Sequence, residues 1–206
     1  MSTGRSPIDE VDELYSRAEQ RVLVRRRSEA PEHFISQLYE DLIQAIELLE
    51  KGANHYPRDK FDETSLTKQI VDRMACFGYA ITAESDSRGH VDVTVTSHRK
   101  TVTWLGEAKI HKDYGWLHKG LEQLVGRYTT GRHADAALLI YIYNKNAATV
   151  LDSWSTKIKE EKLCELVGEP SKRERTTFNS THAHPSWGVP LLVRHLGISL
   201  YYNPKV

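Results

Sequence analysis

Residues 90–96 have the sequence HVDVTVT, and residues 101–110 have the sequence TVTWLGEAKI; these two stretches are the most informative part of the chain. Both alternate apolar and polar residues with a period of two, which is typical of β-strands that bury one face. Because successive side chains in a strand point to opposite faces, Glu107 and Lys109 lie on the same face. A hairpin through residues 97–100 brings Asp92 beside this pair. Two carboxylates and an ammonium on one sheet face form a site for a hard divalent cation and a water nucleophile.

The composition of the whole chain predicts a soluble globular protein. Its 206 residues correspond to one ordinary domain, or to one domain with a modest appendage. The 28 basic and 28 acidic residues give a formal net charge of zero, so polyanion binding requires a local basic patch. The two cysteines form no CxxC pair, which excludes a disulfide framework and a thiolate zinc site. No apolar run has the length of a signal-peptide core or a membrane span, so we expect a cytoplasmic protein with no membrane association.

Helical periodicity before residue 58 predicts an N-terminal appendage. Apolar residues recur every three or four positions over residues 8–22 and again from Phe34 to Leu49. The basic triplet at residues 25–27 is typical of a solvated surface, with a phosphate contact as the alternative. Residues 54–59 have the sequence NHYPRD, which is typical of a linker. We therefore expect residues 1–57 to form a helical hairpin for docking or dimerisation, and residues 58–206 to form the main domain.

The main domain has a distinctive order of expected elements. A helix begins near Asp62 and ends at Gly78, and three strands, a second helix and a strand buried on both faces follow it. A third helix, a polar loop and two strands complete the chain. The ranges expected after the first helix are 79–84, 90–96 and 101–110 for strands, 116–130 for a helix, 136–143 for a strand, 150–163 for a helix, 168–175 for the loop, and 176–182 and 191–202 for strands.

This order, with Asp on the second strand and Glu-x-Lys on the third, resembles the PD-(D/E)xK nuclease superfamily over roughly residues 60–143. The resemblance implies an α/β fold with a restriction-endonuclease-like αβββαβ core, in which helices flank a mixed central sheet. It also implies that Asp92 and Glu107 bind Mg²⁺ or Mn²⁺, with the Ala108 backbone carbonyl as a further ligand. Lys109 would position or deprotonate the attacking water. Glu63, an acid on the leading helix, would act through a second metal or an outer-shell water.

The helix after the third strand is similar to that of the superfamily branch with a Gln-x-x-x-Tyr motif. Gln123 would organise the site or the substrate. In this chain, however, Tyr128 follows Gln123 by five residues, and Arg127 occupies the position four residues on. Because residues i and i+4 of an α-helix share a face, we expect Gln123 to pair with Arg127 and Tyr128 to belong to the core.

Several basic and aromatic residues flank the expected site. The candidate substrate contacts are His90, His111, Lys112, Lys119, Arg127 and Arg132. Trp116 either packs or stacks on a base, and packing is favoured. His182, His184 and His195 are typical of a metal site or of hydrogen-bonded structural residues, and the structural interpretation is favoured because spacing places no third ligand.

The function that these features predict is Mg²⁺-dependent hydrolysis of DNA phosphodiester bonds, in an endonucleolytic mode. By the resemblance, the chain would be the effector nuclease of a bacterial defence or DNA-processing complex, either as a homo-oligomer or with an ATPase or sensor subunit. Two alternatives stay open. One is a non-catalytic nucleic-acid-binding scaffold that keeps the fold, and the other is a structure-selective enzyme similar to the Holliday-junction resolvases.

Overall fold

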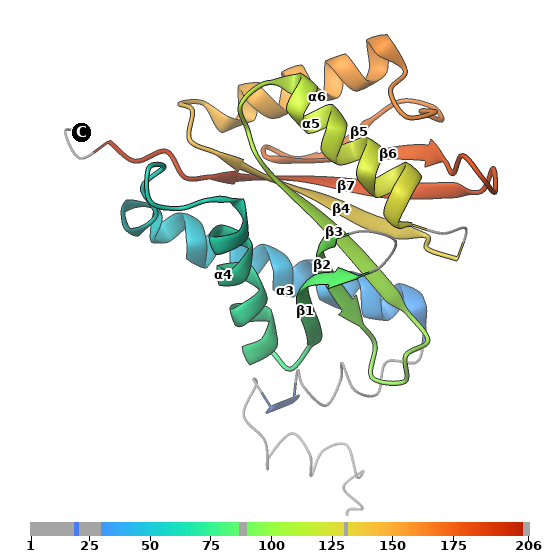
Figure 1. Cartoon of the computed structure of the whole chain (residues 1–206), viewed down its shortest axis with the longest axis horizontal. Helices are drawn as coiled ribbons and strands as arrows, with labels where there is room; N and C mark the ends of the chain where they lie inside the picture. The colour runs from blue at the N-terminus through green and yellow to red at the C-terminus, as the bar shows by residue number, and fades with distance from the viewer. Residues whose placement is uncertain (1–18, 21–29, 87–89, 130–131, 204–206) are drawn as a thin grey trace, which may run out of the picture.

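The computed structural model describes residues 19–20, 30–86, 90–129 and 132–203, and it is an α/β protein (Figure 1). Seven strands form one mixed sheet in the order β1-β2-β3-β4-β7-β6-β5, and helices cover both of its faces. The strands are β1 (Ala80–Asp86), β2 (His90–Thr96), β3 (Thr103–Ile110), β4 (Asp135–Ile142), β5 (Ser171–Glu174), β6 (Thr177–Ala183) and β7 (Pro190–Ser199). The helices are α3 (Pro31–Lys51), η1 (Ala53–His55), α4 (Glu63–Cys76), α5 (Tyr114–Glu122), η2 (Gln123–Tyr128) and α6 (Ala147–Glu161).

The centre of the sheet is parallel and its two sides are antiparallel. Strand β4 runs parallel to both β3 and β7, whereas β1, β2 and β3 form an antiparallel meander and β7, β6 and β5 form another. The apolar sequence of β4 follows from this position, because a central parallel strand is buried on both faces. The hairpin between β2 and β3 confirms the pairing expected from the sequence.

Two hydrophobic cores lie on the two faces of the sheet. Helices α3 and α4 cover one face, and their core includes Leu38, Leu66, Trp104 and Tyr141. Helices α5 and α6 cover the other face with a second core. Trp104 is buried on the side opposite Glu107, as the alternation of β3 predicts.

Helix α3 does not form a separate appendage, which corrects the boundary expected at residue 57. Its buried residues Phe34, Leu42 and Leu49 belong to the same core as residues of α4 and β3. The hydroxyl of Tyr39 donates a hydrogen bond to the carbonyl of Ala136 on β4, over 3.0 Å. The sequence predicted an amphipathic helix correctly, but its apolar stripe packs on the sheet of its own chain. The rest of the expected hairpin, residues 8–22 and the basic triplet at 25–27, lies outside the described residues apart from Glu19 and Gln20.

The polar stretch at residues 168–175 contains a short strand, not only a loop. All four residues of β5 are exposed, and the strand pairs with β6 at the edge of the sheet. Exposed edge strands rich in charge carry no apolar alternation, so periodicity alone does not reveal them. Among the described residues, no helix combines the length and apolarity needed to cross a bilayer.

Candidate active site

The site forms where β2 departs from β3. The antiparallel ladder between the two strands ends at the pair Val93 and Gly106. Beyond that pair β2 continues to follow β1, while β3 continues beside β4 alone. One edge of β3 is therefore free of a neighbouring strand from Glu107 to Ile110, and we call this edge the β3 seam. Unpaired backbone groups at such an edge need other partners.

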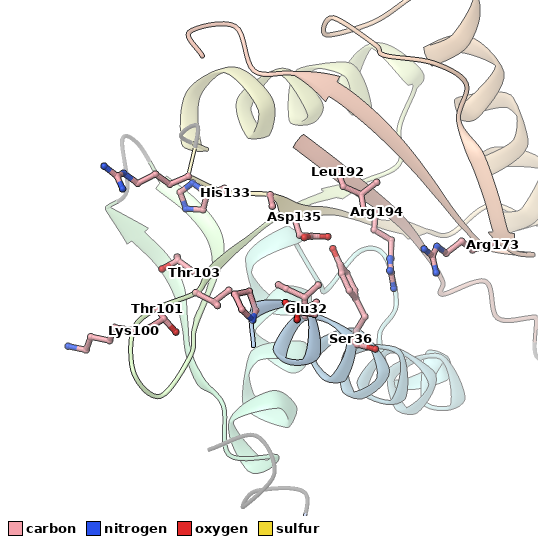
Figure 2. Close-up of a pocket in the computed structure, with 16 residues that line it drawn as sticks. Glu32, Ser36, Lys100, Thr101, Thr103, His133, Asp135, Arg173, Leu192 and Arg194 are labelled. Carbon is pink, nitrogen blue, oxygen red and sulfur yellow. The ribbon is translucent and has the colours of Figure 1, made fainter. Parts of the chain in front are cut away.

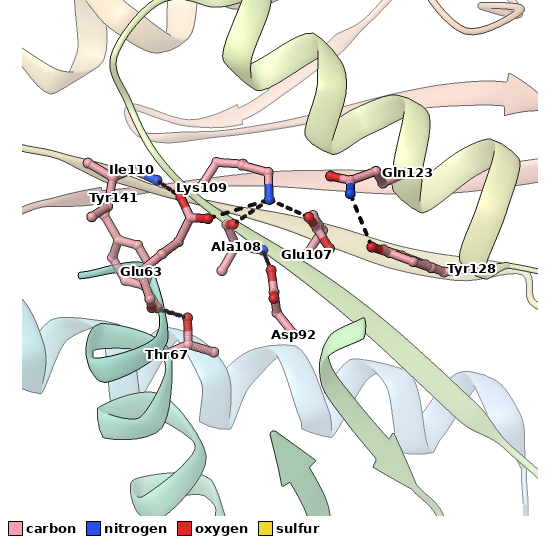
Figure 3. A network of polar contacts seen from close by, with 10 residues as sticks. All are labelled: Glu63, Thr67, Asp92, Glu107, Ala108, Lys109, Ile110, Gln123, Tyr128 and Tyr141. Atoms are coloured by element: carbon pink, nitrogen blue, oxygen red, sulfur yellow. Dashed lines mark hydrogen bonds and ion pairs between the residues drawn. The ribbon is translucent and has the colours of Figure 1, made fainter. Parts of the chain in front are cut away.

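Two carboxylates satisfy the backbone N–H groups of the β3 seam. Asp92, on β2, accepts a hydrogen bond from the N–H of Ala108 at 2.8 Å. Glu63, in the first turn of α4, accepts one from the N–H of Ile110 at 2.6 Å. Side chains from three elements far apart in sequence thus meet along four residues of one strand (Figure 3).

The start of α4 is held firmly, which fixes the position of Glu63. Asp62 caps the helix by accepting from the N–H of Ser65 at 2.8 Å, and the Ser65 hydroxyl accepts from the N–H of Asp62 in return. The hydroxyl of Thr67 donates to the Glu63 carbonyl at 2.7 Å, and Tyr141 on β4 donates to that same hydroxyl at 3.2 Å. The capping and the contact with β4 make Glu63 a rigidly placed acid.

Glu107 and Lys109 project from β3 on the same face, as the sequence predicts. The ammonium of Lys109 donates to Glu107 Oε1 and, at 3.1 Å, to the carbonyl of Ala108. It also lies 3.5 Å from Glu63 Oε1. Glu107 and Lys109 are both buried, although one is acidic and the other basic. Glu107 Oε2 is buried with no hydrogen-bond partner among the described residues.

The electrostatics of the site are those of three carboxyl groups crowded around one ammonium and partly or fully removed from water. Burial, followed by the neighbouring charge of Asp92, raises the pKa of Glu107 to about 8. Burial also raises the pKa of Asp92. Burial acts to lower the pKa of Lys109, but the three nearby carboxylates outweigh it, and the net shift is upward. Three carboxylates face one ammonium, so the site favours an additional cation.

The donor set fits a hard divalent cation. Asp92, Glu107 and the Ala108 carbonyl supply oxygen atoms at one place, and Glu63 adds a third carboxylate beside them. Oxygen ligands suit Mg²⁺ and Mn²⁺, and the unpartnered Glu107 Oε2 is a buried acceptor that such an ion would satisfy. The described residues hold no group of three or more His, Cys, Asp or Glu side chains already in metal-binding geometry. The ammonium of Lys109 lies within salt-bridge distance of both Glu63 and Glu107.

Gln123 pairs with Tyr128, not with Arg127, which corrects the expectation from the sequence. Residues 123–128 form a π-helix, in which hydrogen bonds join residues i and i+5. The spacing of five therefore places both side chains on one face, and the Gln123 amide lies 3.2 Å from the Tyr128 hydroxyl. Tyr128 is buried, and its pKa is raised by burial and then by the charges of Glu107 and Asp92. The burial of Tyr128 in the core below α5 confirms the expected core position. Its contact with Gln123 was not expected, because a spacing of five does not align two side chains on an α-helix.

The ammonium groups of three lysines lie near the ring of Trp116, beside the candidate site. The ammonium of Lys112 lies 4.4 Å from the centroid of a Trp116 ring, that of Lys109 5.6 Å, and that of Lys119 5.9 Å. Lys112 and Lys119 are exposed and form no salt bridge with any described residue. The indole holds the ammoniums through its negative face. Of the six expected substrate contacts, these two lysines share the Trp116 ring with Lys109.

The other four expected contacts have different surroundings. His111 follows β3 directly, and its Nδ1 lies 3.0 Å from the Asn144 side-chain oxygen. Arg127 is exposed beside the ring of Tyr128. Arg132 is separated from the carboxylates and lines a pocket beside α3, because the chain returns there to the start of β4. His90 begins β2, and its side chain lies outside the described part of the structure.

His182 and His195 form a buried hydrogen-bonded chain and no metal site. Trp154 donates to His195 Nδ1 at 3.1 Å, and His195 Nε2 lies 2.7 Å from the Ser180 hydroxyl. That hydroxyl lies 2.6 Å from His182 Nε2, and His182 Nδ1 lies 2.9 Å from the Cys164 carbonyl. Because an indole N–H only donates and a carbonyl only accepts, every proton in the chain points from Trp154 toward Cys164. Both histidines must be neutral for this order to hold.

His184 lies at the end of η2 and makes hydrogen bonds outside the chain of His182 and His195. Its Nε2 lies 3.1 Å from the carbonyl of Thr129, and its Nδ1 accepts from the N–H of Ser186. It therefore donates to Thr129, whose hydroxyl in turn lies 3.0 Å from the carbonyls of Leu124 and Val125. These contacts terminate the π-helix that carries Tyr128.

A scan against protein-family models found no match for this sequence, and searches of curated proteins and of solved structures found none either.

Proposed function

We propose that this chain is a Mg²⁺- or Mn²⁺-dependent nuclease that hydrolyses DNA phosphodiester bonds, built on a restriction-endonuclease-like core. One observation carries the proposal. Asp92, Glu107, Lys109 and Glu63 converge on the β3 seam from two strands and a helix, and the sheet needs only Asp92 and Glu63, as acceptors for N–H groups, whereas it needs no buried pair of Glu107 and Lys109 beside them.

Each residue has a task that follows from its position. Asp92, Glu107 and the Ala108 carbonyl would hold the cation, and Glu63 would act on it directly or through water. The bound cation would supply charge neutralisation at the scissile phosphate and would make water a better nucleophile. Lys109, whose ammonium donates to Glu107 and to the Ala108 carbonyl, would orient that water or donate to a phosphate oxygen. Gln123 donates to the Tyr128 oxygen, which leaves the phenolic proton free for an acceptor in the site.

The substrate would approach over Trp116. The two exposed ammoniums of Lys112 and Lys119 lie near the Trp116 ring, which Lys109 of the site also approaches, and would contact backbone phosphates. Such contacts position a nucleic acid without reading its sequence. DNA is proposed over RNA on the resemblance to the nuclease superfamily.

The direct test is cleavage of supercoiled plasmid in Mg²⁺ by the wild type and by Asp92→Ala and Lys109→Ala. We expect both variants to lose at least about 100-fold in rate, because each removes several kcal/mol of transition-state stabilisation. Arg58→Ala removes an exposed cation outside the site and should cut as the wild type does. It is the control for the effect of a surface substitution in a protein purified in the same way. Equal cutting by all four proteins would overturn the proposal.

A further inference from the structure

A second candidate site lies beside α3, away from the β3 seam. It is a pocket of about 910 Å³ between the first turns of α3 and the starting ends of β3, β4 and β7 (Figure 2). Its charged lining residues are Lys100, Arg132, Arg173, Arg194, Glu32 and Asp135. Four cations against two acids leave a net charge of +2 with His133 neutral. The pocket is therefore basic in a chain whose net charge is zero.

Arg194 is the most informative residue of the pocket. Its guanidinium carbon lies 3.6 Å from the centroid of the Tyr39 ring, so the aromatic face fixes the plane of the group. Its Nε is buried and has no hydrogen-bond partner among the described residues. A guanidinium carries five N–H donors in a rigid fork, and a buried donor without a partner is costly to the folded protein. Arg194 thus has an oriented guanidinium at the wall of the pocket and one buried donor that lacks an acceptor.

Arg173 brings a second guanidinium to the same end of the pocket, as Figure 2 shows. Burial lowers the pKa of Arg194, and the positive charge of Arg173 lowers it further. No salt bridge joins either arginine to a carboxylate within the described ranges. Two guanidiniums at the same end of a pocket repel each other, an anion bound between them would relieve this repulsion, and phosphate is the anion whose geometry matches two forks.

We propose that this pocket binds a small phosphorylated ligand of nucleotide size, with its phosphate on Arg173 and Arg194. The volume lies within the range of about 300–1,000 Å³ that is typical of small-molecule sites. The carboxylates of Glu32 and Asp135 would accept from hydroxyl or amino groups on the rest of the ligand. Arg194 is half-buried against the ring of Tyr39 on α3, so the pocket suits a compact molecule, not a duplex. The proposal does not depend on nuclease activity.

The test is calorimetric titration of the full chain with ATP, pyrophosphate and adenosine, in EDTA so that the β3 seam holds no metal. We expect saturable binding of ATP and pyrophosphate, and at least about tenfold weaker binding of adenosine, since a charged pair of hydrogen bonds is worth more than one power of ten. Asp92→Ala should bind ATP as the wild type does. Absence of saturable binding at millimolar ATP and pyrophosphate would overturn the proposal.

Variants locate the site. Arg173→Gln should weaken ATP binding at least about tenfold, since it removes one of the two forks. It is exposed and so tests the site even if Arg194→Gln fails to fold. Arg58→Gln is the matched control, because Arg58 also lies over a tyrosine ring, that of Tyr143 at 5.8 Å, but outside the pocket. Equal loss in Arg58→Gln and Arg173→Gln would contradict the assignment. So would binding of a 5′-phosphorylated oligonucleotide without binding of ATP, since a DNA end would then be the ligand.

Discussion

The side-chain amide of Gln123 lies 3.2 Å from the hydroxyl of Tyr128, five residues along the chain. In an α-helix a separation of five would turn the two side chains well apart, and only the π-helix of residues 123–128 aligns them. Such local departures from α-helical geometry are frequent at functional sites. The pair lies beside Glu107 on the same side of the β3 seam (Figure 3).

Removing either member of this pair should slow cleavage. We expect Tyr128→Phe and Gln123→Ala each to reduce kcat/KM by about tenfold, the effect of one hydrogen bond of about 1.4 kcal/mol. Because the two act as one unit, the double variant should be no slower than the slower single variant, as a double-mutant cycle would measure. Additive losses would show that Gln123 and Tyr128 act separately.

Metal binding should stabilise the protein through its carboxylates. At a concentration of Mn²⁺ about 100 times the dissociation constant, the gain of about 2.7 kcal/mol raises the Tm by about 5–10 °C. Asp92→Asn and Glu107→Gln should lose this shift, because each removes a ligand charge. Differential scanning fluorimetry measures it without any substrate. A full shift in both variants would place the ion elsewhere.

Gly120 should be essential for the placement of Lys109. A Cβ at this position would lie 2.8 Å from Lys109 Cγ and 3.2 Å from a methyl group of Leu138. Gly120→Ala should therefore cost about 1–3 kcal/mol in the free energy of unfolding and displace the ammonium. Gly126→Ala is the matched control, since a Cβ there meets nothing within 4 Å. We expect lower activity and a lower denaturant midpoint in the first variant and neither in the second; equal behaviour would show that helix α5 can move away.

The buried histidine chain should make stability depend on pH. Burial lowers the pKa of His182, and it lowers the pKa of His195 well below 6.5. Below pH 6.5 the unfolded chain therefore binds protons that the folded chain does not. The free energy of unfolding consequently falls as the pH falls below 6.5. Each histidine contributes up to about 1.4 kcal/mol per pH unit.

Urea denaturation between pH 7.5 and 5 measures this dependence. His182→Gln should have a shallower slope with pH than the wild type, because one of the two protonation sites is gone. His33→Gln, which removes an exposed histidine on α3, should leave the slope unchanged. A slope that does not change in His182→Gln would assign the pH dependence to other groups.

The lysines on Trp116 should govern the salt dependence of DNA binding. Lys112→Ala and Lys119→Ala should each reduce the slope of log affinity against log salt by about one, the effect of one lost phosphate contact. Fluorescence anisotropy in EDTA measures binding without cleavage. Lys51→Ala, at the exposed C-terminal end of α3, removes the same charge far from Trp116 and should change nothing. A slope reduced equally by Lys51→Ala would indicate non-specific attraction.

The alternation of apolar and polar residues was sufficient to predict the centre of the site. It fixes the shared face of Glu107 and Lys109, and the hairpin then limits where Asp92 can lie. Periodicity could not reveal the role of Tyr128, because it does not distinguish an α-helix from a single turn of π-helix. A sequence signal is the hydroxyl of Thr129, which competes for the carbonyls of Leu124 and Val125.

The sequence could not predict where α3 packs, for a different reason. An amphipathic stripe such as Phe34 to Leu49 shows that a helix buries one face, but it does not show against what. The contacts that decide the partner are long-range, among them Tyr39 with Ala136 and with the Trp104 indole. The pocket beside α3 depends on the same contacts, so it too is visible only in the folded chain.

The hydrogen bond from the Ala108 N–H to Asp92 has an evolutionary consequence. Asp92 takes the place of a missing strand, so its carboxylate supports the sheet as well as the proposed chemistry. Glu107 and Lys109 support no backbone group in this way, apart from the bond of Lys109 to the Ala108 carbonyl. A descendant that lost cleavage would be free to change Glu107 and Lys109 first, while an acceptor at position 92 would persist as a remnant of the ancestral site.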